Sequence, residues 1–165
     1  MLFRSGRTPI PEPLAHISID RQGRFLFGAS YLGGVIRVHP IGARGVVQAE
    51  ASYVEHHLPN AHSMMVDPSN RFVFAPVLGA DMVAQRRFDA ATGRLTSNSP
   101  PGIQAKAGQG PRHIKFHPNS RFAYVINELG GTLDVYAYDI ATGMLTAIQH
   151  ETVMPPDFTG TPHAA

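Results

Sequence analysis

The sequence predicts an all-β fold built from repeated units, and three observations support that prediction. One pattern, an apolar run followed by a turn and an Arg-Phe pair, occurs three times, in residues 16–27, 62–74 and 112–124. Its arginines Arg24, Arg71 and Arg121 lie 47 and 50 residues apart. Apolar residues alternate with a period of two rather than 3.6. Glycine and proline, 16 and 14 in number, fall between the apolar runs and indicate turns.

Each unit is expected to contribute four strands in chain order. An innermost strand ends in a tight turn at Asp20, Asp67 or His117, and these side chains are expected to bond the backbone of their own turns. The Arg-Phe stretch then forms a second strand, because it is rich in aromatic and β-branched residues. Third strands are expected at residues 35–40, 82–89 and 132–139. The outer turn repeats in the last two units, where Gly93 and Gly143 suit a positive φ.

A four-stranded unit with a period near 50 residues is typical of a β-propeller blade. We expect three blades, with repeats at about 14–58, 59–108 and 109–155. Propellers typically have four to eight blades. Residues 1–165 are therefore expected to be a partial β-propeller domain that is truncated at both ends. Its open blade edges favour self-association.

Composition and motif searches exclude several classes of protein. The chain has 14 Lys and Arg against 12 Asp and Glu without a basic stripe, so a nucleic-acid partner is not expected. It has no cysteine, which excludes disulfides and thiolate chemistry. With no apolar run of about 18 residues and no secretory signal, a cytoplasmic protein without a membrane partner is expected. No cofactor is expected, and metal binding by His56, His57 and His62 is disfavoured because adjacent residues of an extended segment point in opposite directions.

Polar residues that differ between units at equivalent positions are candidates for function. Seven residues after each repeat arginine stand Tyr31, Leu78 and Glu128, so a carboxylate replaces two bulky side chains. Asn127, just before it, stands where the other units have serine and valine. The alternative interpretation is a solvated glutamate at the mouth of a hairpin.

The start of the innermost strands holds a second set of candidates. His16 and His113 lie eight residues before a repeat arginine, whereas His62 and Arg112 lie nine before. Regular alternation predicts His62 and Arg112 on one face and His16 and His113 on the other, unless a bulge intervenes. Arg112 follows the glycine-rich segment 108–111, and its guanidinium suits bidentate binding of a carboxylate or phosphate. The alternative for the repeated histidines is a structural role.

Four short motifs of the chain occur together in one known family. They are Gly110-Pro-Arg-His113-x-x-Phe-His-Pro118, Asn127-Glu-Leu129, Ala61-His-Ser63 before an Asp-Pro turn, and Met154-Pro-Pro-Asp-Phe158. With them, the chain from about residue 14 onward resembles the 6-phosphogluconolactonase family of seven-bladed β-propellers. Bacterial members of that family hydrolyse 6-phospho-D-glucono-1,5-lactone to 6-phosphogluconate in the pentose phosphate pathway. A full member has about twice as many residues as this chain.

The resemblance implies that His62, Arg112, His113 and Glu128 surround the central channel. Glu128 would be the general base on a water that attacks the lactone carbonyl, and Arg112 would bind an anionic group or the oxyanion. His62 would be an acid, or a hydrogen-bond donor to the ring oxygen as it leaves. No metal is implied. The expected substrate-binding residues are Arg112, His113, Asn127 and His16.

Three other functions stay open. The first is a carboxymuconate-type cycloisomerase, since the fungal enzymes of that class are similar in fold and also handle a lactone. The second is a non-catalytic interaction propeller, which would not require a carboxylate opposite an arginine. The third, favoured by the length, is an inactive fragment. The chain alone is expected to hydrolyse little 6-phosphogluconolactone and to self-associate.

Overall fold

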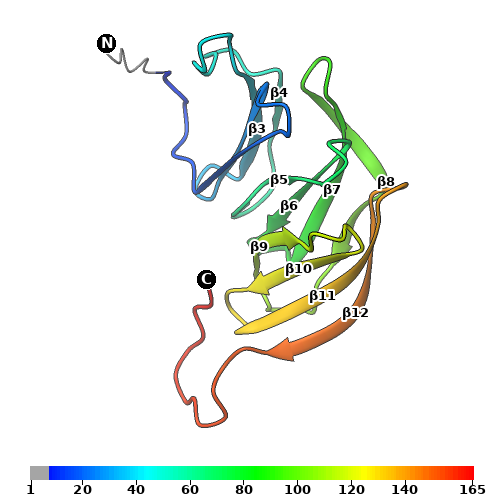
Figure 1. Cartoon of the computed structure of the whole chain (residues 1–165). Coiled ribbons are helices and arrows are strands. Elements are labelled where there is room, and N and C mark those ends of the chain that lie inside the picture. Colours follow the sequence, from blue (N-terminus) through cyan, green and yellow to red (C-terminus); the bar gives the residue numbers. More distant parts are fainter. Residues whose placement is uncertain (1–7) are drawn as a thin grey trace, which may run out of the picture.

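Three antiparallel sheets follow one another along the chain in a computed structural model that describes residues 8–165. Each sheet has four strands arranged in chain order, which confirms the predicted all-β blades (Figure 1). The first contains β1 (His16–Ile19), β2 (Phe25–Ser30), β3 (Val35–Pro40) and β4 (Tyr53–Glu55). The second contains β5 (Met65–Val66), β6 (Phe72–Val77), β7 (Met82–Asp89) and β8 (Arg94–Gln104). The third contains β9 (Pro111–Phe116), β10 (Phe122–Asn127), β11 (Thr132–Asp139) and β12 (Met144–Thr152).

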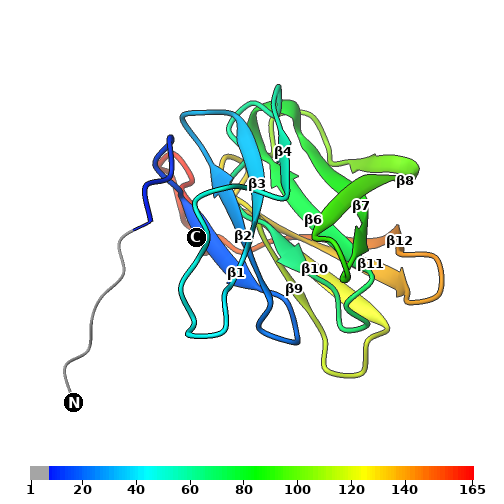
Figure 2. The ribbon, with the colours of Figure 1, turned by 90° about the horizontal axis from the view of Figure 1, so that it is seen from above.

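The third strands β3, β7 and β11 have the bounds expected from the sequence. A short 3₁₀ helix, η1 (Leu78–Ala80), follows β6. Viewed from above, the three sheets fan out side by side (Figure 2). No helix within residues 8–165 has the length and apolar character needed to cross a membrane.

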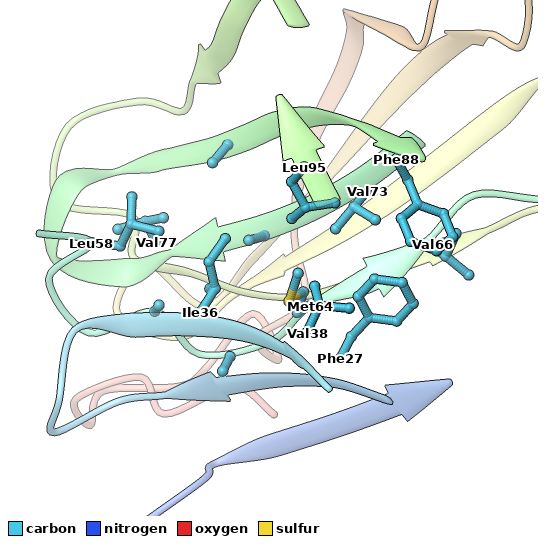
Figure 3. Close-up of a cluster of buried hydrophobic side chains, with 14 of the residues drawn as sticks. Phe27, Ile36, Val38, Leu58, Met64, Val66, Val73, Val77, Phe88 and Leu95 are labelled. Atoms are coloured by element: carbon cyan, nitrogen blue, oxygen red, sulfur yellow. The ribbon is translucent and has the colours of Figure 1, made fainter. Parts of the chain in front are cut away.

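Hydrophobic cores lie between neighbouring sheets. The core between the first and second sheets includes Phe27, Val38 and Met64, which are fully buried (Figure 3). The ring of Phe88 from β7 packs edge-on against Phe25 and Phe27, with centroids 5.7 and 5.1 Å apart. A second core joins the second and third sheets. Each sheet therefore buries its apolar faces against its neighbours, as blades do.

The turns between the first and second strands are held by the polar residues predicted for them. Asp20 accepts hydrogen bonds from the backbone N–H groups of Gln22, Arg24 and Phe25. Asp67 accepts three equivalent bonds at 2.7 to 2.9 Å. His117 accepts one from the backbone N–H of Asn119. These bonds satisfy turn donors and fix where each second strand begins.

Two glycines of the outer turns touch the preceding sheet. Gly93, between β7 and β8, has a φ of 75°, and Gly143, between β11 and β12, has a φ of 70°. A Cβ at Gly93 would overlap the ring of Phe25 in the first sheet. A Cβ at Gly143 would overlap the ring of Phe72 in the second sheet. Both the backbone conformation and the close approach therefore require glycine.

Candidate functional site

Polar side chains from all three sheets meet where the innermost strands begin. His16 opens β1, His62 lies just before β5, and Arg112 and His113 lie at the start of β9. Glu128 directly follows β10, and its backbone N–H donates to the carbonyl oxygen of Gly110 at 2.8 Å. The N–H of His62 is likewise held by a backbone carbonyl, that of Pro76, at 3.0 Å. The main chain of neighbouring strands therefore positions these five residues, which we call the His/Arg/Glu cluster.

A β-bulge at Arg112 corrects the division of faces expected from regular alternation. In the β9–β10 pairing His113 opposes Ile126 and Pro111 opposes Asn127, so Arg112 is the extra residue between them. A bulge bends its strand and redirects side chains. The ring of His113 consequently packs edge-on against His62, at 5.0 Å between centroids, and lies 5.8 Å from His16. The bulge is the exception under which the division of faces was not expected to hold, and the rings of His16, His62 and His113 lie close together.

Glu128 lies between the cationic and imidazole groups of the cluster. Its Oε2 is 3.5 Å from Nη1 of Arg112 and 3.9 Å from Nε2 of His62. Its side chain is 20% exposed, and that of His62 is 12% exposed. Within residues 8–165, His62 Nδ1 and Arg112 Nε are buried atoms that have no hydrogen-bond partner. Buried unpaired polar atoms are rare and point to a bound ligand or water.

Burial makes the imidazoles of the cluster weak bases. It lowers the pKa of His62, and the nearby charge of Arg112 lowers it further. Burial, with contributions from His62 and Arg112, lowers the pKa of His113 to about 4. The pKa of His16 is lowered by burial and by Lys115. These three rings are therefore neutral at pH 7, and Arg112 supplies positive charge beside Glu128.

His16 combines a place in the cluster with a structural contact. Its Nδ1 accepts a hydrogen bond from the backbone N–H of Met64 at 3.4 Å, which links the first sheet to the second. This contact agrees with the structural alternative for that histidine. Its ring still lies beside His113.

The structure does not bring Asn127 into the cluster. Asn127 is fully buried, and its side-chain nitrogen donates to Thr132 Oγ1 at 3.0 Å and to Asp134 Oδ2 at 2.9 Å. Asp134 in turn pairs with His150, so Asn127 belongs to a polar network inside the third sheet. Neighbouring residues of an extended chain point in opposite directions, which sends Asn127 inward when Glu128 faces the cluster. The expected contact between Asn127 and a substrate finds no support in this placement.

Two residues near the cluster were not proposed as site residues from the sequence. Tyr31 packs edge-on against His62 with centroids 5.6 Å apart. It occupies the same repeat position as Glu128, so the alignment of the units could have identified it. His163 lies after β12, with its Nδ1 3.9 Å from Glu128 Oε1. The pair Pro162-His163 repeats the proline and basic residue of Pro111-Arg112, a signal that was present in the sequence.

The surface hollows found elsewhere in the structure do not include residues of the His/Arg/Glu cluster. Surface hollows of about 580 and 290 Å³ are lined by other residues, mainly of outer strands and turns. In the described range 8–165, no three His, Asp or Glu side chains are arranged to hold a metal ion. The cluster is therefore the candidate active site, and its chemistry comes from one carboxylate, one guanidinium and several imidazoles.

Comparisons with known proteins agree with the fold. Residues 4–165 match the family model described as "Lactonase, 7-bladed beta-propeller". The 6-phosphogluconolactonases of Pectobacterium carotovorum and Yersinia pestis are each 43% identical over 165 residues, covering 99% of this chain. The aligned part is 49% and 48% of those proteins, so the chain spans about half their length. Among solved structures, the periplasmic gluconolactonase of Pseudomonas aeruginosa has a TM-score of 0.80 and 32% identity over 88% of this chain and 44% of that one.

Proposed function

The chain belongs to the lactonase family of seven-bladed β-propellers, and from this premise we propose that it hydrolyses a sugar lactone. The observation that carries the proposal is Glu128 facing Arg112 and His62 at the start of the innermost strands. The curated relatives named 6-phosphogluconolactonase favour 6-phospho-D-glucono-1,5-lactone as the substrate. The product would be 6-phosphogluconate, an intermediate of the pentose phosphate pathway.

Glu128 is the proposed general base. It removes a proton from a water molecule whose oxygen attacks the lactone carbonyl carbon, and the carbonyl electron pair moves to oxygen. The tetrahedral intermediate then collapses, the bond to the ring oxygen breaks, and the ring oxygen needs a proton. A positioned base of this kind typically contributes 10² to 10⁴ in rate.

Arg112 is the proposed electrophilic group. Its Nη1 lies 3.5 Å from Glu128 Oε2 and also donates to the carbonyl oxygen of Ala164 at 3.3 Å, while its Nε is buried and unpaired within the described chain. A guanidinium held in this way can turn free N–H donors toward the developing oxyanion or toward an anionic group of the substrate.

Neutral histidines complete the proposed substrate site. Because burial lowers the pKa of His62, its ring is neutral at pH 7 and acts as a hydrogen-bond donor to the ring oxygen rather than as a strong acid. His113 and His16 are proposed to contact sugar hydroxyls, since neutral imidazoles can both donate and accept. Tyr31 adds an aromatic edge beside His62.

We place this reaction in the cytoplasm and expect the isolated chain to self-associate. A phosphorylated sugar is charged and does not cross a membrane unaided, which supports a cytoplasmic enzyme. Self-association is supported by apolar side chains on open sheets: Ile17 and Ile19 of β1 are 60% and 57% exposed, and Ile148 of β12 is 54% exposed.

A lactone panel tests the proposed reaction. The protein with these blades completed to a closed ring is incubated near neutral pH with 6-phosphogluconolactone, with unphosphorylated gluconolactone and with a carboxylated muconolactone, and spontaneous hydrolysis is subtracted. Faster opening of the phosphorylated lactone than of the other two supports the proposal. Turnover of the muconolactone alone would assign the chain to the cycloisomerases instead. A background rate with all three, together with histidine NMR signals that 6-phosphogluconate leaves unchanged, would contradict any lactonase function.

A further inference from the structure

A second imidazole flanks Glu128 on the side away from His62. His62 Nε2 lies 3.9 Å from Oε2 of the carboxylate, and His163 Nδ1 lies 3.9 Å from Oε1. His163 belongs to the segment after β12, outside the three sheets. One carboxylate therefore has a different imidazole at each of its two oxygens.

The segment that carries His163 is fixed to the catalytic candidates by its backbone. The N–H of Ala164 donates to the carbonyl oxygen of Glu128 at 3.2 Å. The carbonyl oxygen of Ala164 accepts from Arg112 Nη1 at 3.3 Å, and Ala164 is only 8% exposed. Further back, Val153 is bonded to Gly131 at 2.9 Å. The residue next to His163 thus contacts both Glu128 and Arg112, which determines where the His163 ring lies.

The two imidazoles differ in their surroundings. The side chain of His62 is 12% exposed and its ring packs against those of His113 and Tyr31. Burial and Arg112 keep the pKa of His62 below its usual value, so this ring is a poor source of protons at pH 7. The mechanism still requires one proton for the leaving ring oxygen and a route by which Glu128 loses the proton it takes from water. His163 is the other imidazole beside the Glu128 carboxylate in the described structure.

We propose that His163 is the proton-transfer residue of this site, donating a proton to the lactone ring oxygen and then taking up the proton that Glu128 removed from water. This inference rests on the proposed lactonase function and assigns a step that Glu128, Arg112 and His62 do not perform. As the bond between carbonyl carbon and ring oxygen breaks, its electron pair goes to the ring oxygen, which takes the proton of the His163 imidazolium. Protonated Glu128 then passes its proton to the neutral His163 ring, and the acid product releases its own proton to solvent. Lactone and water thus give hydroxy acid, and both residues return to their starting states.

The groups around His163 give this step its pH dependence. Glu128 faces its Nδ1 directly, Arg112 binds the next carbonyl of its own segment, and His62 lies on the far oxygen of Glu128. Because the imidazolium form is the proton donor in this step, the rate is expected to fall on the alkaline side of the kcat profile.

The test replaces His163 by asparagine, which retains a side-chain hydrogen-bond donor but cannot transfer a proton in this pH range. The matched control is His117→Asn, the same change at the turn histidine that directly follows β9, away from the His/Arg/Glu cluster. We expect His163→Asn to lower kcat about 10²-fold with little change in KM, and to flatten the alkaline limb of the kcat profile. In His163→Ala, added imidazole should restore part of kcat, which it would not do for a residue with a purely structural role. The control should keep the wild-type profile.

The outcomes separate this inference from the proposed function. If the wild type hydrolyses the lactone and His163→Asn has the same kcat and pH profile, the inference is wrong and the lactonase function stands. If the wild-type protein completed to a closed ring hydrolyses no lactone, the lactonase function and the proton-transfer step that depends on it both fail. A ligand-free measurement tests the underlying contact: the imidazole ¹⁵N signals of His163 should shift in Glu128→Gln, and those of His117 should not. Unchanged His163 signals would also overturn the inference.

Discussion

Two buried polar sites at opposite ends of the blades differ in how many of their hydrogen-bonding groups are paired. At the turn end, Asp67 is fully buried and accepts bonds from three backbone N–H groups and from the hydroxyl of Tyr138 at 2.8 Å. At the end with the His/Arg/Glu cluster, His62 Nδ1 and Arg112 Nε are buried without a partner in the part of the chain that the structure describes. In the described structure, the shortest ion-pair distance to the Glu128 carboxylate is 3.5 Å, to Nη1 of Arg112.

This difference follows the repeat. The turn residues stand at one position of each unit and satisfy their own backbone, so they serve the fold. The cluster residues differ between units, and their hydrogen-bonding capacity is not used up within the chain. Hydrogen-bond donors and acceptors that are left unpaired in a buried site can bind a ligand. Substitutions at the turn end should therefore change stability, and substitutions in the cluster should change activity.

The largest effect is expected from Glu128→Gln, which keeps the shape of the side chain and removes the base. In a protein in which these blades are completed to a closed ring, lactone hydrolysis, corrected for the spontaneous rate, should fall by about 10² to 10⁴, or about 3 to 5 kcal/mol in activation free energy. The urea midpoint should change little, because the Glu128 side chain makes no close hydrogen bond in the described structure. An unchanged rate would move the base elsewhere, with His62 the next candidate.

Asp67→Ala should give the largest loss of stability. It removes the acceptor of three backbone N–H groups and of Tyr138, leaving buried donors unpaired. We expect the free energy of unfolding to fall by about 2 to 4 kcal/mol, measured by urea denaturation. Asp139→Ala, at an exposed turn, is the matched control and should cost far less. Equal losses in the two variants would show that burial of the turn carboxylate is unimportant.

Arg112→Lys should weaken the site by about tenfold in kcat/KM, or about 1.4 kcal/mol, because an ammonium cannot replace a planar bidentate donor. The matched control is Arg121→Lys. Arg121 is an exposed arginine at the turn end of the same sheet, so this change should leave kcat/KM unchanged. If both lysine variants behave as the wild type, the contact with the substrate is not bidentate.

Tyr138→Phe removes only the hydrogen bond that the Tyr138 hydroxyl donates to Asp67 of the second sheet. The equivalent position of the second sheet already holds Phe88, so the ring itself is accommodated. The free energy of unfolding should fall by about 1 kcal/mol, measured by urea denaturation, with no change in lactone hydrolysis. A loss of activity without a loss of stability would contradict the separation of the two ends.

The smallest effect is expected from acid, since the imidazoles of the cluster are partly solvated and water screens their interactions. The folded-state pKa of His113, about 4, lies below its unfolded value near 6.5. The folded state therefore binds fewer protons in this range, and stability should be complete above pH 6.5 and decline as the pH falls toward 4. His113→Gln should flatten this part of the stability curve, measured by thermal unfolding at fixed salt. A curve that stays as steep in the variant assigns the decline to other groups.

The sequence was sufficient for the parts of the molecule that repeat. The bounds of β3, β7 and β11 and the turn bonds of Asp20 and Asp67 follow from alignment of the units. The proximity of Arg112 to Glu128 was implied by the family resemblance. The bulge at Arg112 could not be placed, because one extra residue in β9 depends on its pairing with β10 rather than on composition. The inward direction of Asn127 was available in principle, since it must oppose its neighbour Glu128. His163 lies beyond the third unit, where the alignment ended.

Gly93 and Gly143 also bear on the geometry of ring closure. Each lets an outer turn rest on a phenylalanine ring of the preceding sheet, Phe25 or Phe72, at equivalent points of the two junctions. A methyl group at either position would act as a wedge at the rim while the inner strands stay in contact. The angular step from one sheet to the next would then widen, and in a closed ring these steps must add to one full revolution. The absence of two side chains at the rim thus helps to set the curvature that decides how many blades complete the circle.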